Sequence, residues 1–283
     1  MKTNQKNKTE TSTAMEDEDL SFWDHLHELR KYLIRSIIIF IVFFIAAFSF
    51  RNILFDQFLF RLLNPDFITY QWFTALADFA GIAGAEKIVL DFNLINFRLA
   101  GQFTAHISIS ALAAAVLTLP FLVFQLWLFI KPALYDKERK IIARNAIVIV
   151  LLFLIGCAFA YFIITPLSIV FLGNYQVSEK VSNTISLSSY LSVFNSTILL
   201  SGLLFELPVL LIVLSRIGLI NAQLLRRYRK HAVVGGLILS AIITPTTDPF
   251  TMSVVAIPLY LLYEISILAV AQKEKRHGRK NQT

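Results

Sequence analysis

The sequence predicts an all-α integral membrane protein with six transmembrane helices and both termini in the cytoplasm. Polar stretches separate six apolar runs, which lie at residues 32–50, 102–128, 146–172, 190–214, 231–243 and 250–271. Hydrophobic residues make up 56% of the chain and charged residues only 16%, whereas an ordinary soluble domain has about 25% charged residues. This composition and the six runs together indicate one membrane domain rather than a soluble protein.

The distribution of Lys and Arg predicts the orientation of these helices. Twenty-one of the 26 Lys and Arg residues lie before or just inside the first run, or in segments 129–145, 215–230 and 272–283. The alternate segments, 51–101, 173–189 and 244–249, hold the other five. Because cytoplasmic loops keep the excess of Lys and Arg, we expect both termini on the cytoplasmic side. The net charge of +7 is then explained by topology and by contact with anionic lipid, without a nucleic-acid partner.

The first element is expected to be a short helix on the membrane surface that leads into the first span. Residues 1–19 lack apolar periodicity and predict a flexible cytoplasmic tail. From Ser21 onward, apolar residues fall at helical spacing, and Ser21 with Asp24 has the form of a capping box. Residues 20–272 are therefore interpreted as a single six-span membrane domain, followed by a basic cytoplasmic tail at 273–283.

The long segment 51–101 is expected to lie outside and to cap the outer ends of the spans, because loops of this length usually carry structure of their own. Short helices are predicted at 55–63 and 92–99. The second and third runs exceed the roughly 20 residues that cross a bilayer, and Pro120 and Pro166 are the predicted kink points.

The last two runs are expected to form a short hairpin. Run 231–243 gives only about 20 Å of helix, against a hydrocarbon core of about 30 Å. Asp248, in the outer turn, is predicted to cap the sixth helix, with Pro249 at its first position.

Glu206 is the acid that the apolar pattern places deepest. It lies eight residues from the cytoplasmic end of the fourth run, or about 12 Å of helix. A charged residue at the centre of a span costs at least about 2.5 kcal/mol. Two interpretations stay open: the carboxylate faces a functional cavity, or it forms a hydrogen bond with Ser, Thr or Gln of a neighbouring helix.

Glu28 and Glu138 are acids on the basic side, where acids contribute little to topology. They are either solvated carboxylates paired with neighbouring cations, each pair worth about 0–1 kcal/mol, or parts of a receptor for a cationic peptide. In a receptor, each carboxylate would bind a guanidinium through two parallel hydrogen bonds.

The remaining reactive residue types point to no enzyme. Cys157 is the one cysteine, and the five histidines form no ligand cluster in the sequence. Nucleotide-binding, zinc-protease and serine-hydrolase motifs are missing from the sequence. We expect no catalytic residue, no metal site and no cofactor.

Five motifs, in order, resemble the TatC family, the multispanning receptor of the twin-arginine protein translocase. The first is His-Leu-His-Glu-Leu-Arg-Lys at 25–31, and the second runs from Phe124 to Tyr135 and is followed by Glu138 and Arg139. The third is Phe-Glu-Leu-Pro at 205–208. The last two are Thr244-Pro245 with Asp248, and Tyr-Glu-Ile at 263–265. The similarity covers about residues 21–270.

This resemblance implies a glove-shaped six-helix bundle in the bacterial inner membrane, with short helices five and six. It implies binding of twin-arginine signal peptides of folded cargo by Glu28, Leu29, Arg30, Phe129, Pro132 and Glu138. Glu206 would face the concave side. The implied partners are single-span TatA- and TatB-type proteins and further copies of the chain, and transport would use the proton-motive force. The alternative is a proton- or ion-coupled secondary transporter with Glu206 as its coupling site.

Overall fold

Five helical segments of the structure are long and apolar enough to cross a membrane. The computed structural model describes residues 27–79, 93–130, 136–178, 184–216, 218–244 and 249–280. The candidate spans within these residues are His27–Ser49, Gly101–Phe129, Ala146–Asn174, Leu187–Ser215 and Thr251–Gln272. The predicted all-α membrane fold is therefore confirmed at the level of a helical multi-span protein.

Two of the spans are built from more than one helical segment. The third combines α4 (Asp136–Phe159), the π-helix η4 (Ala160–Ile164) and α5 (Thr165–Asn174). The fourth combines α6 (Leu187–Leu204) and α7 (Leu207–Arg216). A proline stands in the first turn of the last part in each case, Pro166 in α5 and Pro208 in α7, where its missing N–H is tolerated. The second span is the continuous helix α3 (Gly101–Ile130), which contains Pro120.

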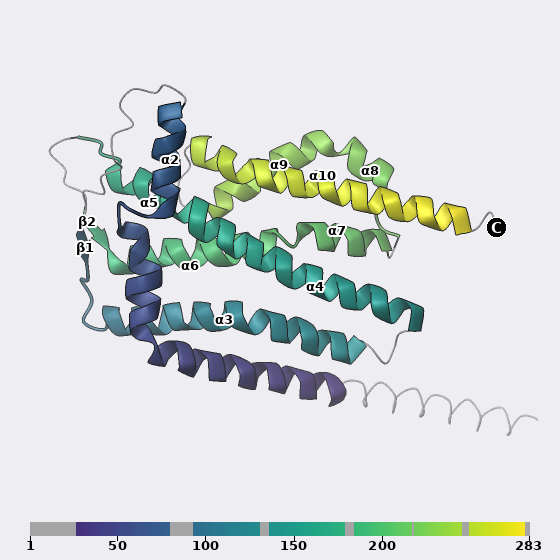
Figure 1. Cartoon of the computed structure of the whole chain (residues 1–283), viewed down its shortest axis with the longest axis horizontal. Helices are drawn as coiled ribbons and strands as arrows, with labels where there is room; N and C mark the ends of the chain where they lie inside the picture. Colours follow the sequence, from purple (N-terminus) through teal and green to yellow (C-terminus); the bar gives the residue numbers. More distant parts are fainter. Residues whose placement is uncertain are drawn as a thin grey trace, which may run out of the picture.

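The long helices lie lengthwise beside one another, with the first described helix against α3 (Figure 1). That helix begins, and α10 (Pro249–Lys280) ends, toward the same end of the molecule. This end also carries the short helix α8 (Ala222–Arg227) with Arg226 and Arg227, and is called the basic end below. The opposite end is called the capped end.

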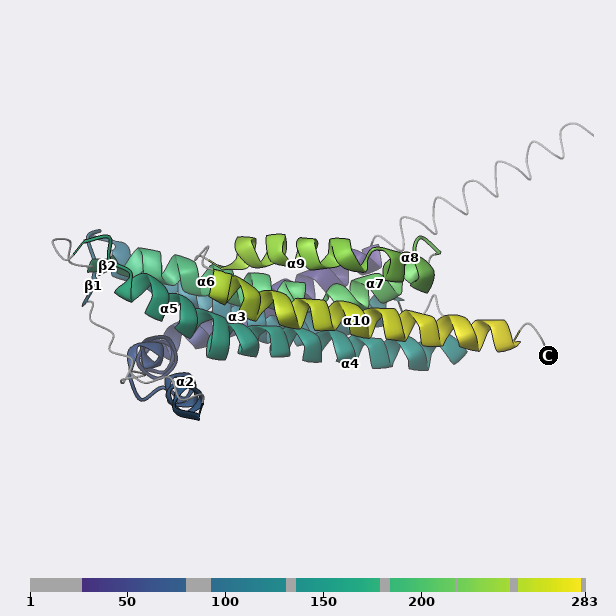
Figure 2. The same ribbon diagram turned by 90° about the horizontal axis from the view of Figure 1, so that it is seen from above.

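Helix α9 (Arg229–Ile243) runs beside α10, as Figures 1 and 2 show. With 15 residues, it is about 22 Å long, so the apolar run at 231–243 does form a short helix. The prediction of a short sixth helix is wrong, because α10 has 32 residues. The physical reason is that Lys, Arg and Glu after the apolar run are good helix formers, so the basic segment continues the helix as far as Lys280.

The capped end is formed by the segment after the first span. It contains the π-helix η1 (Ile53–Leu59), the short helix η2 (Phe60–Leu63) and α2 (Ile68–Phe79). These elements stand across the ends of the long helices, and Figure 2 shows α2 end-on. The helix predicted at 55–63 is thus confirmed.

The helix predicted at 92–99 is wrong. Residues Asn93–Ile95 form strand β1, which pairs in parallel with β2 (Thr184–Ser186). Leu94 lies opposite Ile185 in this register. The partner strand is about ninety residues away in sequence, so local pattern carried no sign of it.

Tyrosine hydroxyls fix the capped end to the spans, as the prediction of a cap requires. Tyr161 donates to the Phe58 carbonyl at 2.9 Å, and Tyr190 donates to the Leu59 carbonyl at 2.8 Å. Within the capping segment itself, Tyr70 of α2 donates to the Leu62 carbonyl of η2 at 2.7 Å, and burial raises the pKa of the Tyr70 phenol well above the usual range. Leu59 and Leu62 are fully buried. The segment is therefore an integral part of the core.

Most buried apolar side chains of the described residues fall into two separate clusters. The larger joins η1, η2, α3, α4, η4 and α6, with Phe153, Ile164 and Phe194 among its members. The smaller lies toward the basic end and joins α8 with α10 through Ala222, Leu225, Ile267 and Val270. The fourth span passes from one cluster toward the other, since α6 packs on α4 and α7 packs on α10.

Candidate functional site

Contacts between aromatic rings hold the first helix, His27–Ser49, against α3. The ring centroids of Tyr32 and Phe129 are 6.1 Å apart, and those of Phe43 and Phe121 are 5.4 Å apart. Toward the capped end, Phe48 stacks on His106, with the two ring centroids 3.8 Å apart. As residue numbers rise along the first helix they fall along α3, so the two helices are antiparallel. The start of the first helix therefore lies beside the last turn of α3.

This register brings two of the predicted signal-binding positions to one place. Glu28 lies one helical turn before Tyr32, on the same face of the helix, and Phe129 contacts Tyr32 directly. Glu28, Leu29 and Arg30 are exposed in the first described turn of the helix. An exposed carboxylate beside an aromatic pair suits a cationic, partly apolar ligand.

The structure does not describe the side chains of two predicted signal-binding residues. Pro132 lies outside the described residues, and Glu138 is described only as a backbone position in the first turn of α4. Asp248 also lies outside the described residues, so its predicted capping role stays a prediction. Helix α10 does begin at Pro249, which is the position that the prediction gave to the first residue of the sixth helix.

Sequence reasoning missed Tyr32. Its hydroxyphenyl ring is half-buried between the first helix and α3, and the guanidinium carbon of Arg35 lies 5.8 Å from the ring centroid. Side chains of a helix lean toward its N-terminus, which here is the basic end, so Arg35 reaches back over Tyr32. A tyrosine four residues after Glu28 was the available signal, but only the register with α3 shows what the ring contacts.

Glu206 lies at the junction between α6 and α7. Helix α6 ends at Leu204 with Phe205 as its C-cap residue, and the Glu206 N–H donates to the Leu203 carbonyl at 3.1 Å. Pro208 in the next turn has no N–H to donate, which leaves the helix interrupted here. The break separates the part of the span packed on α4 from the part packed on α10.

The Glu206 carboxylate is half-buried, and its Oε1 atom is buried with no hydrogen-bond partner among the described residues. A buried polar atom left in this state costs about 1–3 kcal/mol. The sequence left two interpretations open, a functional cavity or a hydrogen bond with Ser, Thr or Gln of a neighbouring helix. The described residues supply no such Ser, Thr or Gln partner to this oxygen. A ligand, a water molecule or another polypeptide chain is a chemically suitable hydrogen-bond partner for this oxygen.

Close packing of α4 on α6 holds the turn before Glu206. Ser201 Oγ donates to the Gly156 carbonyl at 3.0 Å. A Cβ at Gly156 would come within 2.7 Å of the Ser201 carbonyl oxygen, and one at Gly202 within 2.8 Å of the Phe153 ring. The two glycines thus allow the backbones to approach closely and set the position at which the Glu206 junction begins.

Polar contacts tie α8 and α9 to α10 at the basic end. Arg229 Nη2 donates to Glu264 Oε2 at 2.7 Å, and the Tyr260 hydroxyl donates to Glu264 Oε1 at 2.9 Å. Tyr263 donates to the Leu225 carbonyl at 2.8 Å, and the Ala222 N–H donates to Glu274 Oε1 at 3.0 Å. Both carboxylate oxygens of Glu264 therefore have partners, whereas the Oε1 atom of Glu206 has none among the described residues.

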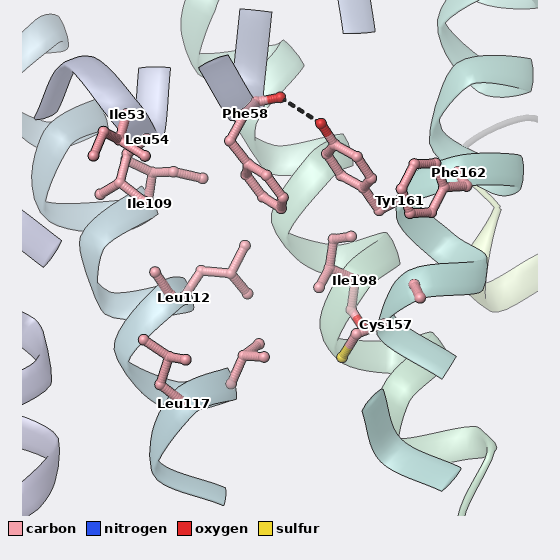
Figure 3. Close-up of a pocket in the computed structure, with 13 residues that line it drawn as sticks. Ile53, Leu54, Phe58, Ile109, Leu112, Leu117, Cys157, Tyr161, Phe162 and Ile198 are labelled. Atoms are coloured by element: carbon pink, nitrogen blue, oxygen red, sulfur yellow. Dashed lines mark hydrogen bonds between the residues drawn. The ribbon is translucent and has the colours of Figure 1, made fainter. Parts of the chain in front are cut away.

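An apolar cavity of about 400 Å³ lies between α3, η4 and α6 below the capping segment (Figure 3). Buried Ile109, Cys157 and Ile198 line its inner part, and Phe58 and Leu117 lie at its more exposed side. The only hydrogen bond drawn among the lining residues joins Tyr161 to the Phe58 carbonyl. Such a lining suits apolar chains rather than a polar solute. In the described part of the chain, no group of three His, Cys, Asp or Glu residues could hold a metal ion.

Comparisons with known proteins agree on one family. The family model for "Sec-independent protein translocase protein (TatC)" matches residues 24–258. The chain is 36% identical to the TatC protein of Blattabacterium sp. over 254 residues, which cover 89% of this chain and 95% of the relative. It is 31% identical to the Escherichia coli (strain K12) TatC protein over 243 residues, or 86% of this chain and 85% of the relative.

The fold comparison gives the same result. A crystal structure of the twin-arginine translocase receptor TatC in DDM superposes with a TM-score of 0.64 at 33% identity, covering 87% of this chain and 99% of that chain. A second crystal structure of the TatC receptor gives a TM-score of 0.59 at 31% identity, with 86% and 96% coverage.

Proposed function

Because this chain belongs to the TatC family of Sec-independent protein translocase proteins and is a multi-pass membrane protein, we propose that it binds the twin-arginine signal peptides of folded proteins. The ligand class is suggested by the similar crystal structures, which are of a twin-arginine translocase receptor. The family is one of protein translocase components, so the chain is assigned to protein transport rather than enzymatic catalysis. The secondary-transporter alternative is set aside for the same reason.

The observation that carries this proposal is the contact between Tyr32 and Phe129. It supports one binding surface made from the start of the first helix and the end of α3, with Glu28, Leu29, Arg30 and Phe129 on it. Pro132 and Glu138 follow α3 in sequence and complete the proposed set. Glu28 and Glu138 each bind one guanidinium of the arginine pair, through the bidentate geometry that lysine lacks.

In the proposed topology, the protein lies in the bacterial inner membrane with six spans, of which α9 is the fifth. Both termini lie in the cytoplasm. The excess of Lys and Arg at the basic end supports this orientation, and the shared end of the first helix and α10 supports an even number of spans. Helix α9, at about 22 Å, requires a locally thinned bilayer or cover from its neighbours. The glove shape is carried over from the family.

Glu206 is proposed to act in transport rather than in signal recognition. It lies inside the fourth span, at the α6–α7 junction, whereas Glu28 lies at the basic end. Its unpartnered carboxylate oxygen supports contact with another chain during transport.

The proposed partners are TatA- and TatB-type single-span proteins and further copies of this chain, with the proton-motive force as energy source and no cofactor. Asp248 is proposed to cap α10 in the outer turn of the hairpin.

Photocrosslinking of a signal peptide in membranes tests the binding proposal. A crosslinker placed beside the arginine pair should label the wild-type chain, and Glu28→Gln or Glu138→Gln should remove most of the label. Asp56→Asn, an exposed acid in η1 at the capped end, is the matched control and should keep it. Full labelling of both Gln variants would reject the proposed binding residues.

A further inference from the structure

We propose that Tyr32 determines specificity in the same binding surface: its ring stacks against a guanidinium of the incoming signal while Glu28 pairs with that guanidinium. The inference rests on the proposed signal-peptide function and adds a residue to it. Its ligand is a planar cation, so the preference it creates is for arginine over lysine.

The side chains of Glu28 and Tyr32 lie on the same face of the first helix. Glu28 and Tyr32 are separated by four residues in one continuous helix, so their Cβ atoms lie about 5–6 Å apart on one face. Both belong to the end of the helix that meets the last turn of α3. One guanidinium can therefore touch the carboxylate with its N–H groups and the ring with its plane.

The Tyr32 ring is held in place but is not fully buried. Phe129 contacts Tyr32 in a T-shaped arrangement with an angle of 68° between the ring planes, which fixes the ring's orientation. Tyr32 nevertheless stays half-buried rather than buried. A fixed, partly accessible aromatic ring is the arrangement that stacks a cation without a further ordering cost.

The Tyr32 ring already contacts one guanidinium, that of Arg35. The Arg35 guanidinium carbon lies 5.8 Å from the Tyr32 centroid, within the distance of about 6 Å at which a cation is attracted by the ring. Arg35 is exposed, so its side chain can leave the ring for water. In the proposed complex, an arginine of the signal takes this place, and Arg35 occupies it when no signal is bound.

Stacking separates arginine from lysine more sharply than charge does. The guanidinium is planar and weakly hydrated, whereas the lysine ammonium is compact and strongly hydrated. A cation–π contact at a partly exposed site contributes a factor of about two- to thirtyfold in affinity. Loss of the ring should therefore reduce binding of an arginine pair more than binding of a peptide in which lysine replaces one arginine.

The experiment measures the dissociation constants of synthetic signal peptides for the full-length chain in nanodiscs, with Arg-Arg and Lys-Arg forms of one peptide. Wild type should prefer the Arg-Arg form. Tyr32→Leu should weaken Arg-Arg binding about three- to tenfold and Lys-Arg binding less, so that the preference shrinks. Tyr32→Phe should keep the preference, because the ring remains. Tyr228→Leu, at a half-exposed tyrosine of the basic end, should change neither constant.

Three results would overturn the inference: no wild-type preference, an unchanged preference in Tyr32→Leu, or equal losses in Tyr32→Phe and Tyr32→Leu. An equal weakening of both peptides by Tyr32→Leu leaves the preference unchanged and would mean that the ring only holds the helix in place. Glu28→Gln measured alongside separates the two proposals. If it abolishes binding while Tyr32→Leu is silent, only the Tyr32 inference fails. If Glu28→Gln and Glu138→Gln both bind normally, the proposed binding residues fail.

Discussion

Arg229 and Glu264, which are 35 residues apart in sequence, form a 2.7 Å ion pair that ties the start of α9 to the middle of α10. The Tyr260 hydroxyl occupies the other carboxylate oxygen at 2.9 Å. Glu264 and Glu206 are both acids within candidate spans, but one is paired at both oxygens and the other has a buried oxygen without a partner. Substitution of the acid should therefore lower the stability of the protein at Glu264 but not at Glu206.

Replacing Glu264 should destabilise the protein slightly. The Arg229 and Glu264 side chains are 49% and 25% exposed, so solvent screening limits the pair to about 0–1 kcal/mol. Glu264→Gln should lower the apparent Tm of the purified protein in detergent by up to a few degrees. In a double-mutant cycle with Arg229→Gln, the two effects should be less than additive. Fully additive losses would show that the two side chains do not interact.

Replacing Glu206 should lower transport without lowering stability. Glu206→Gln keeps the shape of the side chain and removes the charge from a half-buried site whose oxygen lacks a partner. We expect an unchanged or higher apparent Tm, normal crosslinking to the signal peptide, and a severalfold loss of folded-cargo export. Equal losses of crosslinking and export would reject a separate transport role for Glu206.

Adding a methyl group at Gly156 should disturb the packing that precedes Glu206. The new Cβ would lie 2.7 Å from the Ser201 carbonyl oxygen, and a backbone atom cannot move aside as a side chain can. Gly156→Ala should therefore cost about 1–3 kcal/mol, seen as a lower apparent Tm. Gly235→Ala is the matched control, because its Cβ would meet no atom within 4 Å. Equal stability of the two variants would contradict the close contact of α4 and α6.

Removing one hydroxyl should loosen the capped end. Tyr190→Phe leaves the Leu59 carbonyl without its 2.8 Å donor in a buried site, which should cost about 1–3 kcal/mol. Limited proteolysis from the outer side should then cut residues 51–101 faster than in wild type. Tyr228→Phe, at a half-exposed tyrosine of the basic end, should leave the rate unchanged. Unaltered cleavage in Tyr190→Phe would show that this bond does not hold the cap.

The spans were predictable because each is signalled by composition within the segment itself. Thus 102–128 and 146–172 fall within Gly101–Phe129 and Ala146–Asn174. Strand β1 was not predictable, because its partner β2 comes from a different loop. The length of α10 was missed because the basic residues after position 272 were interpreted as a tail, although their helix propensity is high.

The candidate site was predictable in residue type but not in geometry. The motif at 25–31 pointed to Glu28, and the Phe-Glu-Leu-Pro motif pointed to Glu206. The contact of Tyr32 with Phe129 depends on the register between the first helix and α3, which no local pattern specifies. The ion pair of Arg229 with Glu264 likewise depends on how α9 packs on α10.

Complementation is the most direct test of the proposal that Glu28 and Glu138 receive the arginine pair. The chain carrying Glu28→Gln and Glu138→Gln together is expressed in cells that lack their own TatC protein, and export of a folded twin-arginine cargo is measured. With protein levels matched by immunoblot, we expect wild type to restore export and the double variant to fail. Export by the double variant at the wild-type rate would contradict the account.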